Sequence, residues 1–370
     1  MPVPLDELPV HQVPLSMEHM ASSDRNAYDR YYFCAHDRTG DVFLITGLGV
    51  YPNLGVIDAF ATVGVGDKQH AVRISDALGK DRSIPSVGPY RIEVVESLQR
   101  LRLVCDTPEH GVAFDLTFEG SFPAADEVRH VWRRNGRIAL DAQRFAQVGT
   151  WSGTLNVAGT DMAVDPEVWV GTRDRSWGIR PVGEAEPPGR AGDEPIEGFF
   201  WTYIPMRFDD FALLVIIQED PDGTRVLNDA IRVFPASSGR PPEQLGWPEI
   251  EMHYRSGTRI PESATLHLQQ RGHKELVVQV DSLGHVALNS GPGYGGDPMW
   301  THGEWRGRKW VDSQVYDMSD PSVAAMVPFG VVDHVGRATC EGQVGWGLFE
   351  HATFGRHDPT GFKDFTSVAP

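Results

Sequence analysis

Cysteine is scarce in this sequence. Only Cys34, Cys105 and Cys340 occur among 370 residues, and they are widely spaced and odd in number. Such a set supplies neither a disulfide framework nor the paired spacing of a zinc site, and it is typical of proteins in a reducing compartment. We therefore expect a cytoplasmic protein.

Long apolar runs and positive charge are also missing. No apolar stretch approaches the ~20 residues of a membrane-spanning helix. The N-terminus lacks the basic start and apolar run of a signal peptide. The 51 acidic residues outnumber the 33 basic ones, which gives a formal net charge of −18. Because phosphate groups bind to basic surface, this balance argues against nucleic acid and anionic membranes as partners. It leaves a small neutral ligand open.

Three common catalytic signatures are absent as well. None of the 14 histidines falls in H-E-x-x-H spacing, and no G-x-S-x-G segment occurs. Gly47-Leu-Gly49 and Gly64-Val-Gly66 lack the further glycine and the helix that a phosphate-binding loop needs. We therefore expect no bound metal ion and no cofactor.

The sequence does contain the pattern of an all-β protein. Val112, Phe114, Leu116 and Phe118 alternate with small or polar residues, as in a strand with one buried face. Residues 211–217 form a continuous apolar run, which is typical of a buried strand. Many short segments of this kind, with frequent Gly and Pro between them, predict closed or sandwiched antiparallel sheets.

The composition of the chain predicts an arm, a linker and two domains. Residues 1–22 are rich in proline and predict an extended arm, and residues 184–195 (EAEPPGRAGDEP) have the composition of a linker. We expect consecutive antiparallel β domains at residues 23–183 and 196–370. Residues 24–32 are predicted as a short helix with Asp24 as its cap.

One segment is unusually dense in groups that are costly to bury. Residues 171–180, GTRDRSWGIR, hold three arginines, an aspartate and a tryptophan, with glycines that would let the backbone turn tightly. A guanidinium can hold a carboxylate in charge-assisted geometry, and an indole offers a flat apolar wall with one donor. The cluster suits the floor of a ligand pocket. We expect Arg173 or Arg180 to pair with Asp174 or another carboxylate, and at least part of the cluster to be buried. The alternative is an ion-paired β corner with a structural tryptophan.

This segment resembles the G-x-R-D-x-S-W-G-x-R signature of the AttH-like/carotenoid 1,2-hydratase superfamily, which also includes the kievitone hydratases and some Diels–Alderases. The matching residues are Gly171, Arg173, Asp174, Ser176, Trp177, Gly178 and Arg180. The resemblance implies two consecutive lipocalin-like β-barrels or half-open sandwiches. Arg175 departs from the signature, because the hydratases usually have a histidine there that is a proposed acid–base group. Since an arginine cannot release a proton near neutral pH, any proton donor must come from elsewhere.

A short internal echo favours two similar halves. Residues 147–153 (QVGTWSG) resemble residues 343–347 (QVGWG), about half a chain later. Chance is the competing explanation for so short a match.

A glycine-rich segment with several aromatic residues could form the rim or lid of a pocket. Residues 291–307 (GPGYGGDPMWTHGEWRG) contain Tyr294, Trp300, His302 and Trp305. Loops carry function more often than strand interiors do, which favours this interpretation. The alternative is an aromatic-stabilised surface loop that closes the end of a barrel.

Glu350 is a third candidate, at the end of a predicted strand. In the related family a glutamate recurs after G-x-G-x-x-E, and residues 345–350 repeat that spacing. An inward-facing Glu350 in an apolar cavity would have a raised pKa and could donate a proton. Alternatively, it is solvated or pairs with Arg356. Asp333 and His334 are neighbours, so on a strand they point to opposite faces and form no dyad.

These observations predict a cofactor-free hydratase or dehydratase, cyclase or isomerase that acts on a hydrophobic small molecule, such as a terpenoid, polyketide or steroid-like compound. The expected catalytic residues are Asp174, Glu350 and His302. The expected substrate-binding residues are Arg173, Trp177, Arg180, Tyr294, Trp300 and Trp305. Because arginines flank it, Asp174 should have a depressed pKa, which leaves Glu350 or His302 as the proton donor. The alternative is a non-catalytic carrier or sensor of a hydrophobic ligand.

Overall fold

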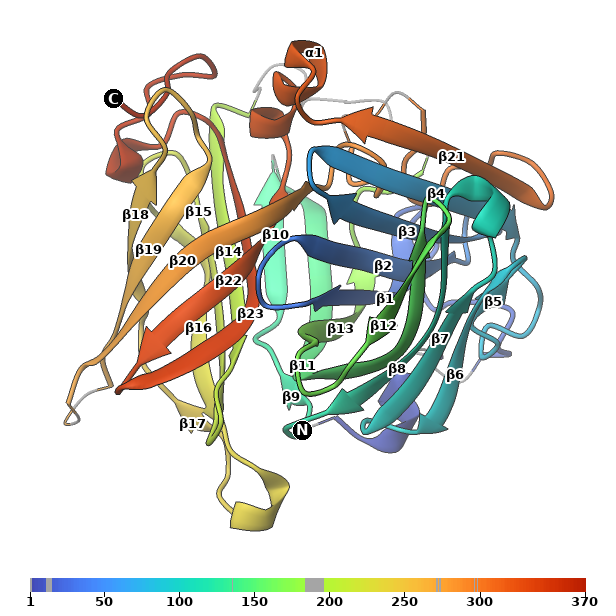
Figure 1. The fold of residues 1–370 in the computed structure, drawn as a ribbon, viewed down its shortest axis with the longest axis horizontal. Coiled ribbons are helices and arrows are strands. Elements are labelled where there is room, and N and C mark those ends of the chain that lie inside the picture. The colour runs from blue at the N-terminus through green and yellow to red at the C-terminus, as the bar shows by residue number, and fades with distance from the viewer. Residues whose placement is uncertain are drawn as a thin grey trace.

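Two curled antiparallel sheets stand side by side in the computed structural model (Figure 1), one with 14 strands and one with nine. The structure describes residues 2–10, 15–134, 136–183, 196–270, 272, 274–295, 297 and 299–370. The predicted linker at residues 184–195 lies outside these ranges.

The first sheet contains the strands that precede residue 184, together with one later strand. They are β1 (Ala27–His36), β2 (Val42–Tyr51), β3 (Val56–Val65), β4 (Lys68–Ala77), β5 (Ser86–Val87), β6 (Tyr90–Glu96), β7 (Arg100–Cys105), β8 (Val112–Gly120), β9 (Ala125–Asp126), β10 (His130–Arg134), β11 (Arg137–Val157), β12 (Thr160–Val164), β13 (Val170–Ile179) and β21 (Trp310–Asp317). Neighbouring strands follow the order β21-β4-β3-β2-β1-β13-β11-β8-β7-β6-β5, and β9, β10 and β12 pair with β11.

The second sheet is formed by later strands alone. They are β14 (Gly198–Arg207), β15 (Ala212–Glu219), β16 (Arg225–Val233), β17 (Glu243–Gln244), β18 (Glu249–Tyr254), β19 (Pro261–Leu268), β20 (Leu276–Ala287), β22 (Val332–Cys340) and β23 (Gln343–Gly355). Their order is β17-β16-β15-β14-β23-β22-β20-β19-β18. In both sheets the first long strand therefore pairs with the last one of its half, β1 with β13 and β14 with β23.

Strand β21 crosses from the second half of the chain to the first sheet. It pairs along its whole length with β4, from Trp310 opposite Ser75 to Asp317 opposite Lys68. Its orange arrow lies beside the blue β4 in Figure 1. The described residues of the loop that precedes β21 (291–295, 297 and 299–307) are thereby held against the first sheet.

Helix is a minor component of the described residues. The α-helix α1 (Pro321–Ala324) has four residues, and the other helical turns are of the 3-10 type: η1 (Pro4–Glu7), η2 (Pro108–His110), η4 (Ala236–Ser238), η5 (Val327–Phe329) and η6 (Asp358–Thr360). The predicted all-β class is confirmed. None of the described helices is long and apolar enough to span a bilayer.

The helix predicted at residues 24–32 is wrong, because this segment leads into β1. Every residue of β1 is buried, and the strand lies between β2 and β13. Aromatic side chains such as Tyr28 and Tyr32 favour a pleated, covered position. Asp24 starts a turn instead, since its Oδ1 accepts the backbone N–H of Asn26 at 2.8 Å.

Apolar side chains pack in three main layers, one inside each sheet and one between the two sheets. One core fills the curl of the first sheet and contains Phe33 and Trp151. Another fills the curl of the second sheet and contains Leu266. The third lies between the sheets, where Cys34 of β1 and Leu214 of β15 belong to the same cluster. The two sheets therefore pack face to face, and a cavity left in this layer would be enclosed by both.

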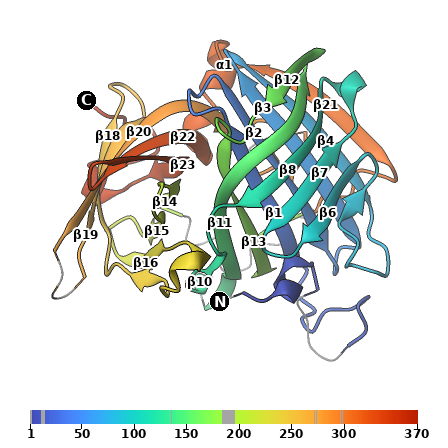
Figure 2. The same ribbon diagram turned by 60° about the horizontal axis from the view of Figure 1, so that its bottom comes forward.

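The N-terminal arm lies beside the first sheet (Figure 2), and a buried ion pair fixes it there. Glu7 and Arg173 are both fully buried, and two guanidinium nitrogens donate to the two carboxylate oxygens at 2.5 and 2.8 Å. The backbone N–H of Leu98 also donates to Glu7, and the Tyr31 hydroxyl donates to the Glu7 carbonyl oxygen. The arginine of the motif is thus used to anchor the arm.

We predict that Glu7→Gln lowers the free energy of unfolding by about 3 kcal/mol, because it leaves Arg173 as a buried cation without its counter-charge. Glu18→Gln is the matched control. Its partner Lys80 is exposed and 3.7 Å away, so the free energy of unfolding should hardly change. Chemical denaturation measures both, and equal midpoints for Glu7→Gln and wild type would contradict this role of the arm.

Candidate functional site

The motif at residues 171–180 forms most of β13, where successive side chains point to opposite faces of the sheet. The side chains that face the second sheet and line a cavity there are Asp174, Ser176 and Arg180. The side chains that point into the curl of the first sheet are Arg173, Arg175 and Trp177. The motif is therefore split into a half that lines the cavity and a half that supports the sheet.

The supporting half explains most of the charge in the motif. Arg173 pairs with Glu7, and Arg175 pairs with Asp29 at 2.5 Å, all four side chains being fully buried. The Arg175 guanidinium also lies 3.9 Å from the centre of the Tyr31 ring. The expectation of a buried, carboxylate-paired arginine is confirmed. Position 175, where the hydratases usually have histidine, does not face the cavity in this chain.

The two glycines of the motif allow close strand packing, whereas the sequence suggested tight turns. A Cβ on Gly171 would lie 1.9 Å from the carbonyl oxygen of Cys34 on β1. A Cβ on Gly178 would lie 2.1 Å from the carbonyl oxygen of Asp141 on β11, and its φ of +134° favours glycine. Both neighbours of β13 therefore require glycine at these positions.

The inner cavity has a volume of about 210 Å³ and lies between the two sheets. In its first wall, the pairing of β13 with β1 and β11 places Tyr32 opposite Asp174, and Ser176 between Arg30 and Arg144. The first sheet also contributes the side chains of Trp132, Leu140 and Ala142. The opposite wall is formed by residues from the second half of the chain: Phe199, Trp201, Tyr203, Leu288, Val331 and Glu350.

A pair of carboxyl groups lies at the second wall. Asp333 of β22 is directly opposite Glu350 of β23, and the two side chains are close enough to hydrogen-bond. The Tyr32 hydroxyl donates to Asp333 at 2.5 Å, and the Trp201 indole N–H donates to Glu350. Both Asp333 and Trp201 are buried.

These two carboxyl groups cannot both be ionised at low cost. Burial raises the pKa of Asp333 well above its usual value, and the charge of Glu350 raises it further. Burial also raises the pKa of Glu350, which the hydrogen bonds from Asp333 and Trp201 partly oppose. Asp333 Oδ1 is buried without any other hydrogen-bond partner among the described residues. Burial and the neighbouring charge therefore favour one proton shared by the pair and carried mainly by Asp333.

Glu350 does not pair with Arg356, whose guanidinium binds Asp358 instead. It is half-buried and lines the inner cavity. The expectation that Asp333 and His334 face opposite ways is confirmed, since His334 contacts Ser282 at 2.8 Å.

A second acidic group lies across the cavity. Burial raises the pKa of Asp174, although Arg144, Arg30 and Arg180 oppose the shift. The expected depressed pKa is therefore wrong, because the alternation of β13 turns two of the flanking arginines away and burial outweighs the rest. Glu127 lies 3.3 Å from Arg144, and burial raises its pKa to about 7.

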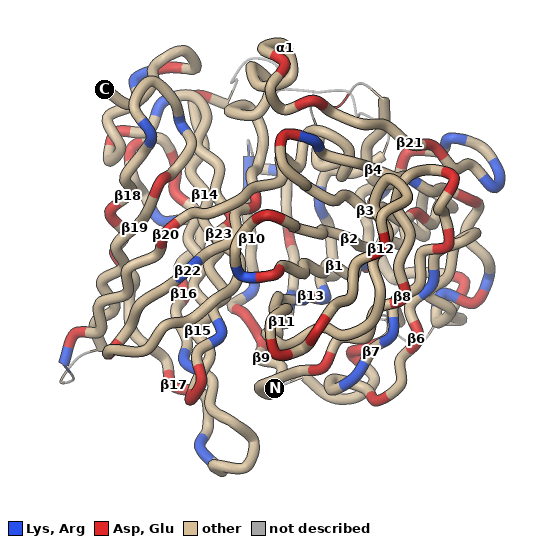
Figure 3. Tube along the Cα trace, in the orientation of Figure 1, with Lys and Arg blue, Asp and Glu red and all other residues tan. Residues whose placement is uncertain are grey.

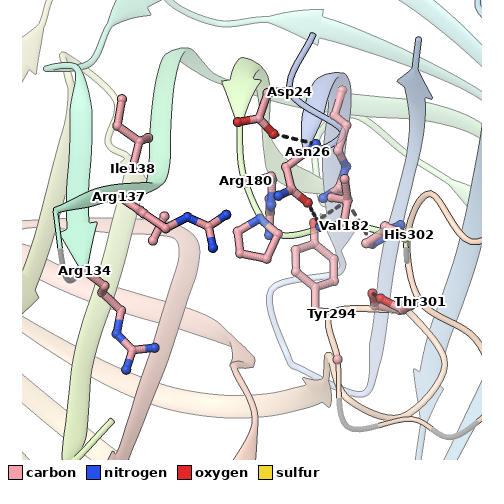
Figure 4. Close-up of a pocket in the computed structure, with 16 residues that line it drawn as sticks. Asp24, Asn26, Arg134, Arg137, Ile138, Arg180, Val182, Tyr294, Thr301 and His302 are labelled. Atoms are coloured by element: carbon pink, nitrogen blue, oxygen red, sulfur yellow. Dashed lines mark hydrogen bonds between the residues drawn. The ribbon is translucent and has the colours of Figure 1, made fainter. Parts of the chain in front are cut away.

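An outer pocket of about 480 Å³ adjoins the inner cavity (Figure 4). Arg30, Arg180 and Tyr294 line both spaces and form the boundary between them. Arg30 Nη2 contacts the Tyr294 hydroxyl at 3.1 Å and His302 Nε2 at 2.9 Å. Since a guanidinium can only donate, His302 Nε2 is the acceptor, and the ring proton is on Nδ1, 3.8 Å from Asp58.

The structure therefore separates the residues that the sequence grouped in one loop. Burial, with the charges of Arg30 and Arg180, lowers the pKa of His302 well below its usual value, so the imidazole is neutral. Trp300 is buried and packs on His302 with ring centres 4.9 Å apart. Trp305 is 49% exposed and is not among the described residues that line either space.

Several residues of the site were not among the site candidates predicted from the sequence: Arg30, Tyr32, Glu127, Arg144, Trp201, Tyr203 and Asp333. Two of them lie in the segment predicted as a helix, which hid the alternation of β1. The described residues contain no cluster of three or more His, Cys, Asp or Glu side chains arranged to hold a metal ion.

The fold has known counterparts. A family model described as "Family of unknown function (DUF8625)" matches residues 3–363. No curated protein sequence matches the chain. Among solved structures the chain is similar to kievitone hydratase from Nectria haematococca (C2 SG), with a TM-score of 0.51, 15% identity, and coverage of 87% of this chain and 88% of that chain. The predicted lipocalin-like fold is confirmed by this match.

Two further structures are similar to a lesser degree. One is CghA with Sch210972, with a TM-score of 0.49, 11% identity, and coverage of 93% of this chain and 94% of that chain. The other is CghA, with a TM-score of 0.47, 14% identity, and coverage of 88% of each chain.

We predict that Glu127 makes the stability of the protein depend on pH. Between its ordinary pKa of 4.5 and its folded pKa of about 7, the folded chain retains a proton that the unfolded chain releases. Stability therefore falls as pH rises through this window and is constant above it. Glu127→Gln removes that loss, so its free energy of unfolding should rise relative to wild type by about 3 kcal/mol between pH 4.5 and 7.

Denaturation at several pH values measures this difference. Glu119→Gln is the control, because Glu119 is a surface side chain that is 52% exposed, and its curve should run parallel to that of wild type. A Glu127→Gln curve that is also parallel to wild type would show that Glu127 is not held in a proton-retaining environment.

Proposed function

The chain belongs to the DUF8625 family, and we propose that it is a cofactor-free enzyme that moves protons on a small molecule bound between its two sheets. The reaction class is hydration, dehydration, cyclisation or isomerisation. The similarity to kievitone hydratase concerns the fold alone. The proposal therefore rests on the side chains that line the inner cavity.

The observation that carries the proposal is the carboxyl pair of Asp333 and Glu350. Of the two, only Glu350 is among the described lining residues of the inner cavity, so it is the group that can touch a substrate. Asp333 lies behind it and holds the proton, oriented by the Tyr32 hydroxyl. With a single proton on the pair, Asp333 passes it to Glu350 through their shared hydrogen bond as Glu350 protonates the substrate, and a proton from solvent restores the pair afterwards.

Asp174 provides a partner group on the opposite wall. Addition of water to a double bond needs one proton delivered to carbon and one removed from water, and dehydration needs the reverse. Glu350 and Asp174 line the same cavity from different sheets, so they can serve as donor and acceptor on two sides of a substrate. Arg30, Arg144 and Arg180 would stabilise the negative charge that develops between them.

The remaining residues of the site bind the substrate or give the cavity its shape. His302 is neutral and accepts a hydrogen bond from Arg30, so we assign it to positioning Arg30. Phe199, Trp201, Leu288 and Val331 give the inner cavity an apolar side, which suits a hydrophobic substrate such as a terpenoid, polyketide or steroid-like compound. Trp177 and Arg173 would contribute through the support that they give to β13.

We predict that Glu350→Gln lowers turnover by about 10²- to 10⁴-fold, because an amide cannot transfer the proton. Binding should stay within about tenfold of wild type, which corresponds to roughly 1.4 kcal/mol. Asp333→Asn should lower turnover and shift its pH optimum, since it removes the proton reservoir. Glu249→Gln, an exposed glutamate on the second sheet, is the control and should leave turnover unchanged.

Candidate substrates are identified by mass spectrometry of the small molecules that co-purify with the protein. Incubation of each candidate in D₂O then reports proton transfer as a gain in mass. A ligand that binds wild type and returns chemically unchanged, without deuterium, would make the protein a carrier. Turnover that survives in both Glu350→Gln and Asp333→Asn would exclude the assigned carboxyl pair.

A further inference from the structure

Arg180 is a cation without a directly paired carboxylate at the boundary between the two spaces, although its charge acts on Asp174 of the same cavity. Within the described residues its guanidinium has no hydrogen-bond or carboxylate partner, and its contacts are the rings of Tyr28 and Tyr294, 5.6 and 5.5 Å away. Burial, together with repulsion from Arg30, lowers its pKa below the usual value for arginine. A partly buried cation in this position is costly unless an anion joins it.

Arg30 adds a second incomplete cation to the same boundary. It is only 3% exposed, and Tyr294 and His302 together occupy Nη2 alone. Its Nη1 is buried without a hydrogen-bond partner in the part of the chain that the structure describes. The Tyr294 ring lies against both guanidinium groups, 4.9 Å from that of Arg30. Neither Tyr294 nor the neutral His302 supplies a negative charge, and Asp58, whose charge acts on Arg30, forms no salt bridge with it.

The outer pocket is basic, although the protein as a whole is acidic. Asp and Glu are spread along both sheets and the loops of the chain, whose formal net charge is −18 (Figure 3). Yet four arginines line this pocket, Arg30, Arg134, Arg137 and Arg180, against one carboxylate, Asp24, among the described lining residues. Figure 4 shows Arg134 and Arg137 on one side of it. Arg30 and Arg180 therefore border a pocket whose described lining residues include more basic than acidic side chains.

We propose that Arg30 and Arg180 form the binding site for a carboxylate of the substrate, whose apolar part then lies in the inner cavity beside Glu350. The substrate class is therefore an acidic, largely apolar small molecule. Two guanidinium groups that lie against the same tyrosine ring offer several donors to a planar carboxylate, and the anion offsets their mutual repulsion. The inference rests on the proposed function of this cavity, because it names the kind of substrate that the carboxyl pair would act on.

The test compares two probes of equal shape, 2-naphthoate and its neutral amide 2-naphthamide, by ligand-observed NMR and calorimetry at neutral pH. Wild type should bind 2-naphthoate at least tenfold more tightly than 2-naphthamide. Binding of 2-naphthoate no tighter than that of the amide, or of neither probe at millimolar concentration, overturns the inference. This comparison needs no variant.

Two substitutions of Arg180 test whether the preference for 2-naphthoate arises from the arginines between the inner cavity and the outer pocket. Arg180→Met and Arg180→Gln remove the charge, and both should reduce the preference for 2-naphthoate to within twofold, provided that their circular dichroism and thermal melting resemble those of wild type. The control is Arg337→Met, which makes the same change in net charge at an exposed arginine paired with Asp281. It should keep the full preference. A preference retained in folded Arg180 variants overturns the inference.

The result can be separated from the fate of the proposed function. Glu350→Gln should lose turnover and keep the preference for 2-naphthoate, since the two depend on different groups. Turnover that depends on Glu350 without any anion preference would leave the function standing and overturn the carboxylate site. An anion preference with every ligand returned unchanged would support the site and overturn the enzyme.

Discussion

The central constraint in this structure is that two carboxyl groups meet across neighbouring strands in an enclosed layer, where burial favours keeping one proton on the pair. Asp333 and Glu350 are in register on β22 and β23, and burial disfavours a second negative charge. The pair is held by donors from both sheets, since Tyr32 belongs to β1 and Trp201 to β14. The site therefore exists only when the two sheets are packed face to face, and the apolar layer between them is part of the chemistry.

The two sheets contribute to this site in related ways. In each sheet the first strand pairs with the last of its half, and a cavity-facing acid on the last strand is opposite a tyrosine on the first: Asp174 opposite Tyr32, and Glu350 opposite Tyr203. Each tyrosine reaches toward an acid of the other sheet, Tyr32 toward Asp333 and Tyr203 toward Glu127. The echo between residues 147–153 and 343–347 falls on β11 and β23, which hold different places in their sheets. The topology, and not that echo, relates the two halves.

The sequence predicted those features that are local. Alternation from Val112 to Phe118 predicted a half-buried strand, and the motif predicted both the fold and a buried, paired arginine. What it could not reveal depends on partners far along the chain. Arg173 is neutralised by Glu7, 166 residues away, and the environment of Asp174 follows from which arginines share its face of β13. Glu350 resembled a solvated strand end because Trp201 and Asp333 reach it only through pairing of β23 with β14 and β22. The strand β1 was mistaken for a helix because polar residues interrupt its aromatic ones.

The protonation state of the Asp333–Glu350 pair tests this account most directly. In protein labelled with ¹³C at the side-chain carboxyl carbons of Asp and Glu, chemical shifts followed against pH report each group, with Asp333→Asn and Glu350→Gln as assignments. The account predicts that Asp333 is protonated at neutral pH, that the two groups titrate together, and that removal of Glu350 changes the titration of Asp333. Two separately ionised carboxylates at neutral pH would contradict it.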